Sequence, residues 1–263
     1  MNEPDNELER KLMLAAGNPA SRPEFYQALM ESTIFIIGST SSGGEGATTI
    51  PAGATLSIAN WEKKDGTPII PFFTSLDALQ RALREEADYV ALPARSFFEM
   101  TQGAQLVLNP SSSYGKEFTP DEVRALLETG MNHVSQPRVV QEETRVLLGQ
   151  PAQYPAEMIA ALTELLAKHA AVKAAYLCLM QDPTTGEKPA LVIGFDGEGD
   201  MTEALKQAGS VAADTAPKGE IVDFVLLRKD DSSISEYMFE SVQPFYERSW
   251  GAKLQSLPSP GRA

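Results

Sequence analysis

The segment from Asp65 to Ser75 (DGTPIIPFFTS) constrains the fold more than any other part of this sequence. Its Asp-Gly pair favours a tight hairpin turn, so we expect residues 54–62 and 67–73 to be two paired strands. The second strand contains two prolines, which cannot donate backbone hydrogen bonds, and this predicts a strand that lies partly at a sheet edge. Thr74 or Ser75 then caps the helix that follows.

Apolar spacing, caps and breakers predict further elements in the first half of the chain. We expect Ser21 to cap one of these helices, and we read the Gly/Ser/Thr-rich residues 38–53 as a mobile loop. The predicted helices are residues 5–16, 21–31, 76–86, 94–101 and 119–128, and the predicted strands are residues 33–37, 54–62, 67–73, 88–93, 105–109 and 139–148.

The second half follows a Pro-rich segment at residues 151–155, which we interpret as a linker. Asp200 is expected to open one of its helices and Gly209 to close it. The predicted elements are a helix after residue 155, strands at 172–180, 189–195 and 221–228, a helix from residue 200 and a final helix at 233–248. The predicted fold class is therefore α+β, with two tandem mixed α/β domains at 1–149 and 150–263, each a small sheet flanked by helices.

Charge excludes two classes of partner. The formal net charge is −14 over 263 residues, and the hydrophobic content of 43% is high enough for folded cores. A surface this acidic repels nucleic-acid phosphates and anionic membranes, so we expect neither partner. No stretch of the sequence reaches the length of a membrane span, and the acidic N-terminus lacks the apolar core of a signal peptide. We expect a cytoplasmic protein.

The single cysteine, Cys178, excludes an internal disulfide and a cysteine-rich zinc site. It lies in an apolar run, where a buried and inert thiol is expected. His133 lies in a polar segment and is expected to be solvated. His169 continues the apolar stripe of the helix after residue 155, so it is either a packing residue at the helix end or, less simply, a proton shuttle.

Two acidic or glycine-rich segments imitate ligand-binding motifs. Residues 196–200 (DGEGD) share their first spacings with a calcium loop but lack its later glycine and glutamate. Residues 41–48 and 194–199 are glycine-rich, but neither contains the lysine of a phosphate-binding loop. We therefore predict no metal and no cofactor.

Several short motifs resemble the bacterial SseB (enhanced serine sensitivity) family. They are residues 22–26 (RPEFY), 61–66 (WEKKDG), 71–75 (PFFTS) and 115–118 (GKEF) for its N-terminal domain, and 209–215 (GSVAADT) and 244–248 (PFYER) for its C-terminal domain. The resemblance spans nearly the whole chain. It implies a cytoplasmic bacterial protein whose overproduction sensitises cells to serine, and it implies no defined activity, cofactor or catalytic residue.

The candidate surface is consequently weakly defined. Thr74 and Ser75 precede a helix, where backbone amides favour a small anion. Tyr246 and Trp250 form either a partner-binding patch or a core anchor, and His169 completes the set. We predict a non-enzymatic regulator that binds another protein or a small metabolite, with a link to serine or sulfur amino-acid metabolism that rests on the resemblance alone. An enzyme with a site between the domains, and a homo-oligomer, are the alternatives.

Overall fold

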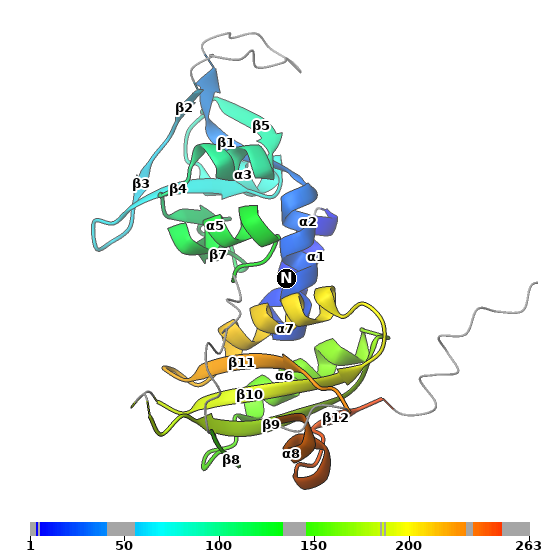
Figure 1. The fold of residues 1–263 in the computed structure, drawn as a ribbon. Coiled ribbons are helices and arrows are strands. Elements are labelled where there is room, and N and C mark those ends of the chain that lie inside the picture. Colours follow the sequence, from blue (N-terminus) through cyan, green and yellow to red (C-terminus); the bar gives the residue numbers. More distant parts are fainter. Residues whose placement is uncertain are drawn as a thin grey trace, which may run out of the picture. The chain divides into compact units, whose positions relative to one another are not determined.

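The computed structural model describes residues 4, 6–40, 56–133, 146–184, 186, 188–229 and 234–248. The chain divides into two compact units, Met1–Val134 and Ser135–Ala263. Each contains a sheet with helices packed on it (Figure 1), so the predicted fold class is confirmed. The predicted boundary at 149/150 falls directly after a short strand that belongs to the second sheet. No described helix is both long and apolar enough to cross a membrane.

The first unit is built on seven strands within its described residues, in the order β2-β1-β4-β6-β7, with β3 beside β4 and β5 beside β1. The strands are β1 (Thr33–Thr40), β2 (Leu56–Ile58), β3 (Trp61–Glu62), β4 (Pro68–Phe73), β5 (Tyr89–Pro93), β6 (Leu106–Leu108) and β7 (Lys116–Phe118). The helices are α1 (Glu7–Gly17), α2 (Arg22–Glu31), α3 (Leu76–Ala82), α4 (Ala94–Met100) and α5 (Pro120–Thr129), with a 3-10 turn, η1, at Pro19–Ser21.

Successive side chains of β1 point to opposite faces of the sheet, so the core of this unit is divided between the two faces. Ile34 and Ile36 face α1, α2, α4 and α5, and Ile37 lies with Phe73 against α3. The larger core contains four phenylalanines whose ring centroids are 5.2–6.0 Å apart, namely Phe72, Phe97, Phe98 and Phe118. These rings bury a large apolar area between the sheet and the helices on this face.

Strand β4 is not at an edge, and that prediction is wrong. It pairs with β6 on one side and with β3 and β1 on the other. Pro71 is tolerated because β3 pairs with β4 before it and β1 after it. The carbonyl oxygen of Ile37, the next residue along β1, accepts instead from the amide of Ala59 at 3.0 Å. The missing N–H of Pro71 therefore falls where no ladder bond is needed.

Three cap and turn predictions of this unit can be compared directly. The hairpin turn is confirmed, because Gly66 has φ +82° and β3 pairs with β4. Ser75 caps α3, its Oγ accepting from the Ala78 amide at 3.0 Å. Ser21 precedes α2 but makes no side-chain capping bond, so that prediction is wrong. Of the predicted mobile loop at 38–53, residues 38–40 belong to β1, so that part of the prediction is wrong, and residues 41–53 lie outside the described residues.

The second unit has a five-stranded sheet within its described part, in the order β11-β10-β9-β12, with β8 also beside β9. Its elements are β8 (Leu147–Gly149), α6 (Ala156–Ala167), β9 (Val172–Gln181), β10 (Ala190–Gly197), α7 (Thr202–Thr215), β11 (Ile221–Leu226), α8 (Ile234–Ser241) and β12 (Tyr246–Glu247). Helices α6 and α7 lie on one face of the sheet and α8 on the other (Figure 1). Strands β10 and β11 run parallel, joined through α7.

Two predictions in this unit are corrected. Helix α7 does not end at Gly209 but continues to Thr215, because Gly209 lies on its buried side among small residues. The final helix does not reach residue 248. Helix α8 ends at Ser241, three residues before Pro244, whose ring cannot continue a helix, and Tyr246 then pairs with β9 as strand β12.

Candidate functional site

The predicted residues Thr74 and Ser75 lie at the carboxyl end of β4, beside the carboxyl end of its parallel neighbour β6. Asn109 directly follows β6 with φ 48°, in the left-handed region that asparagine tolerates. Its side-chain oxygen accepts from the Thr74 amide at 3.0 Å, and its side-chain nitrogen donates to Thr74 Oγ1 at 2.9 Å. The two strand ends are thus held together by side-chain bonds.

A carboxylate of the chain itself completes this cluster. Thr74 Oγ1 donates to Glu9 Oε1 at 2.6 Å, and Ser75 Oγ donates to the same oxygen at 2.9 Å. Asn6 adds a bond from its side-chain nitrogen to the Thr74 carbonyl at 2.9 Å. Glu9, Thr74, Ser75 and Asn109 are all buried. The Ala78 amide of α3 is satisfied by Ser75 Oγ, Glu9 accepts from that same hydroxyl, and the cluster fastens α1 to the sheet.

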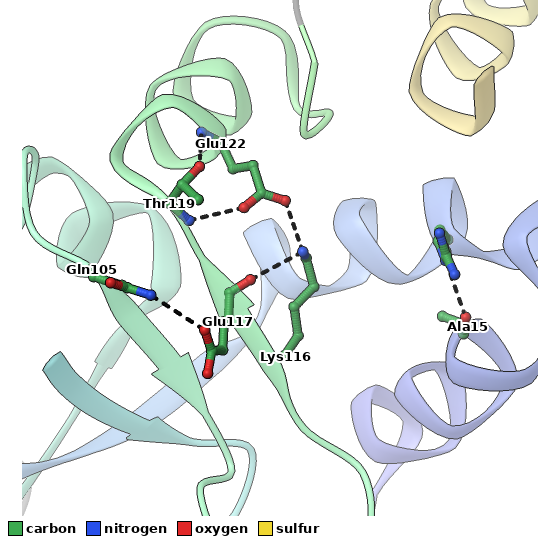
Figure 2. A network of polar contacts seen from close by, with 7 residues as sticks. Ala15, Gln105, Lys116, Glu117, Thr119 and Glu122 are labelled. Carbon is green, nitrogen blue, oxygen red and sulfur yellow. Dashed lines mark hydrogen bonds and ion pairs between the residues drawn. The ribbon is translucent and has the colours of Figure 1, made fainter. Parts of the chain in front are cut away.

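A second polar network surrounds Lys116 in β7 (Figure 2). Lys116 Nζ lies 2.7 Å from Glu122 Oε1. The other carboxylate oxygen, Glu122 Oε2, accepts from the Thr119 amide at 2.8 Å and completes a capping box. The ammonium also lies 4.9 Å from the centroid of the Phe118 ring. These contacts satisfy the start of α5 and seal the edge of the phenylalanine core, which is a structural role.

His169 lies just beyond α6 and is half-buried. Its Nε2 is 3.1 Å from Gln207 Oε1 on α7, and its backbone carbonyl accepts from Arg248 at 2.5 Å. Arg248 also donates to the Val172 carbonyl at 3.1 Å. His169 therefore links the end of α6 to α7 and to the segment after β12, as the packing interpretation expected.

The two aromatic candidates, Tyr246 and Trp250, have different outcomes. Tyr246 is buried in β12, where it pairs with Ala175 of β9, and thus serves the core. Trp250 lies outside the described residues, and so does the predicted strand 139–148 up to residue 145. Thr74 and Ser75 belong to the first unit, whereas His169 and Tyr246 belong to the second. The candidates do not form one site within either unit.

Cys178 is fully buried in β9, as predicted. Burial raises the pKa of its thiol from the ordinary 9.0 to about 11. The thiol is therefore protonated at neutral pH and is a poor nucleophile. Across the described residues, no group of three or more His, Cys, Asp or Glu side chains could hold a metal ion.

A pocket of about 320 Å3 lies where the parallel strands β10 and β11 end. We call the apolar residues of its lining the floor; they include Phe195 of β10, Met201 before α7, Leu205 of α7 and Leu226 of β11. The carboxyl ends of adjacent parallel strands are the usual place for ligands in sheets with helical crossovers. Thr202 and Leu205 of the first turn of α7 also line the pocket.

Opposite charges stand on the rim of this pocket. Arg228 follows β11, and its guanidinium makes no ion pair with any described residue. Asp200 precedes α7 and accepts from the Thr202 amide at 2.9 Å. Bonds from the Thr202 hydroxyl and amide lower the pKa of the Asp200 carboxyl, so it is ionised at neutral pH. The pocket thus offers a cation, an anion and an apolar floor to a small molecule.

The backbone of β10 shapes the pocket at Gly197. A Cβ atom there would lie 2.4 Å from the Ala171 carbonyl oxygen and 2.4 Å from Met201 Sδ. Only glycine fits this position without displacing the backbone of one neighbour and the floor of the pocket. In the sequence, this segment resembled a calcium or phosphate loop and the start of a helix, and neither pattern indicates a pocket. A strand-helix-strand order in this half, which implies a parallel pair, was the signal that could have located the pocket.

Comparison with known proteins covers both units. Residues 8–125 match the SseB protein N-terminal domain, and residues 140–248 match the SseB protein C-terminal domain. The chain is 40% identical over 257 residues to Protein SseB of Escherichia coli (strain K12), and equally to Protein SseB of Shigella flexneri. Each alignment covers 98% of both chains. No solved structure matches the chain.

Proposed function

Because this chain belongs to the SseB protein family over both of its domains, we propose that it is a non-enzymatic cytoplasmic binding and regulatory protein. Its ligand is a small polar metabolite, and its binding site is the pocket at the ends of β10 and β11. The observation that carries this proposal is the combination of an apolar floor with Arg228 and Asp200 on the rim.

The charges on the rim narrow the class of ligand. Arg228 favours a carboxylate or another small anion, because a guanidinium is a natural partner of such a group. Asp200 disfavours a polyanion such as a nucleotide triphosphate and favours a ligand that also carries a positive charge. The volume of about 320 Å3 lies at the lower end of the range for ligand pockets, which favours a small molecule.

The proposed connection to serine or sulfur amino-acid metabolism rests on the family resemblance. It directs the choice of compounds, which begins with serine, cysteine and related thioacids and extends to nucleotides and divalent metals. A ligand that binds only the native state stabilises it by about 2.7 kcal/mol at 100 times its Kd. A thermal-shift screen would register this as a rise in Tm of several degrees.

A substitution inside the pocket makes the screen specific. Leu205→Trp fills the space between α7 and β11, whereas Leu14→Trp places the same side chain on an exposed position of α1 in the other unit. We expect a stabilising compound to lose its effect in the first variant and keep it in the second. A flat response across the whole panel would contradict metabolite binding and point to a protein partner. Equal stabilisation of both variants would place the site elsewhere.

A further inference from the structure

Strand β11 is one edge of the second sheet (Figure 1). The Leu227 amide donates to the Phe195 carbonyl of β10 at 2.9 Å, so the odd-numbered residues of β11 direct their backbone groups toward β10. Val222, Phe224 and Leu226 therefore direct theirs outward. Within the described residues, no strand pairs with this side of β11.

The open part of the edge has defined ends. Before it, the Glu220 amide donates to the Pro217 carbonyl at 3.0 Å in a turn. After it, the Arg228 amide donates to Ser235 Oγ at 3.2 Å. The outward amides at both ends are thus satisfied, and within the described residues no strand pairs with the three amides between them.

The outward-directed residues of β11 are apolar. Its sequence is Ile-Val-Asp-Phe-Val-Leu, and Leu226 is 43% exposed. Natural sheets usually guard such an edge with charged side chains, proline or a bulge. Strand β11 contains no lysine or proline and pairs with β10 in an unbroken register, and its one charged residue, Asp223, directs its backbone groups toward β10. Because Val222, Phe224 and Leu226 direct theirs outward, this regular edge is suited to accept another strand.

We propose that β11 pairs with β11 of a second copy of this chain, in antiparallel orientation about a two-fold axis. Antiparallel pairing joins outward-facing residues of both strands directly. One register pairs all three outward-directed residues. In it, Val222 lies opposite Leu226 of the partner subunit, and Phe224 lies opposite its own copy at the axis. Two five-stranded sheets then become one continuous sheet.

Charge selects a second copy over an unrelated strand. In the same register, Glu220 lies opposite Arg228 of the partner subunit, and the two-fold axis creates this pair twice. Both side chains are exposed, and neither forms an ion pair within the described part of the chain. A shift of the register by two residues would separate both pairs. The edge is therefore self-complementary in its amides, its apolar side chains and its charges.

The interface is small, so the association is weak. One strand pair buries less than the roughly 1,600 Å2 of a standard protein interface. We expect a dimer with a Kd in the micromolar range, which sedimentation velocity on the full chain detects between about 1 and about 200 μM. Val222→Pro removes one outward amide, and proline is accepted at a sheet edge, so this variant should stay folded and monomeric.

Charge reversal provides the decisive comparison. Glu220→Arg and Arg228→Glu should each weaken dimerisation about tenfold or more, because each places like charges opposite one another. The double variant E220R/R228E should recover to within about threefold of the original Kd. Glu240→Arg, at an exposed position of α8, is the matched control and should change nothing. A chain that stays monomeric to about 200 μM, or a double variant no tighter than the singles, would overturn the proposal.

Discussion

The buried cluster around Thr74 gives a sharp stability prediction for the first unit. Thr74→Val keeps the shape of the side chain but removes its hydroxyl, which donates to Glu9 at 2.6 Å and accepts from Asn109 at 2.9 Å. A hydrogen bond to a carboxylate contributes about 1.5–3 kcal/mol, and a buried amide left without its acceptor costs about 1–3 kcal/mol. Because these two effects overlap, we expect a loss of about 3 kcal/mol.

Urea unfolding measured through Trp61 tests this value. The Trp61 ring lies 6.3 Å from that of Phe73, one residue before Thr74, so its fluorescence reports on this unit. The chain has two tryptophans, and a Trp250→Phe background leaves Trp61 as the only one. With an m value of about 2 kcal/mol/M, the midpoint should fall by about 1.5 M.

Two further variants separate the hydrogen bonds from other effects. Thr74→Ser keeps the hydroxyl and loses one buried methyl, so it should cost only about 1 kcal/mol. Thr33→Val makes the same substitution at an exposed position of β1 and should stay within about 0.5 kcal/mol of the parent. If Thr74→Val also stays within about 0.5 kcal/mol, the reasoning about the cluster is refuted.

Three other outcomes are expected. Glu122→Ala removes a capping-box bond and the ion pair with Lys116, so the free energy of unfolding of the first unit should fall by about 1–2 kcal/mol in the same urea assay. Glu122→Gln still accepts from the Thr119 amide and should lose about half of that. Cys178 should react with a disulfide reagent at pH 8 at least about 100-fold more slowly in the native protein than in guanidinium. Because burial raises its pKa from 9.0 to about 11, the unfolded chain loses this proton first, and stability should fall as pH rises between these values. Cys178→Ala should remove that part of the slope; an unchanged slope would show that the thiol is not the cause.

The sequence predicted best those elements whose cause lies within a few residues. The Ser75 cap and the Gly66 turn each depend on local chemistry, and both are present. Gly209 failed as a helix stop because its role is set by packing on the buried side of α7. Pro244 was a local signal for the end of α8 that the helical spacing of the neighbouring aromatics obscured.

The candidate site depended on information that no single segment holds. Asp200 was identified as a helix cap, but its place on the rim of a pocket follows from the parallel pairing of β10 with β11. Arg228 lies more than 25 residues after Asp200 in the chain, and it reaches the same rim because β11 ends beside the end of β10. Glu9 reaches Thr74 across 65 residues, and nothing in either local sequence indicates that contact.

Strands β1 and β3 share one side of β4, and Pro71 at their junction affects the register of the first sheet. Strand β1 pairs with Phe72 and Phe73 and leaves the ladder at Ile37, where continued pairing would meet Pro71. If β1 were moved along β4 by two residues, Phe35 would lie opposite Pro71. Its carbonyl would then face the proline nitrogen, which has no hydrogen to donate. Pro71 thus disfavours this shifted register and helps to specify the observed alignment of β1 with β4.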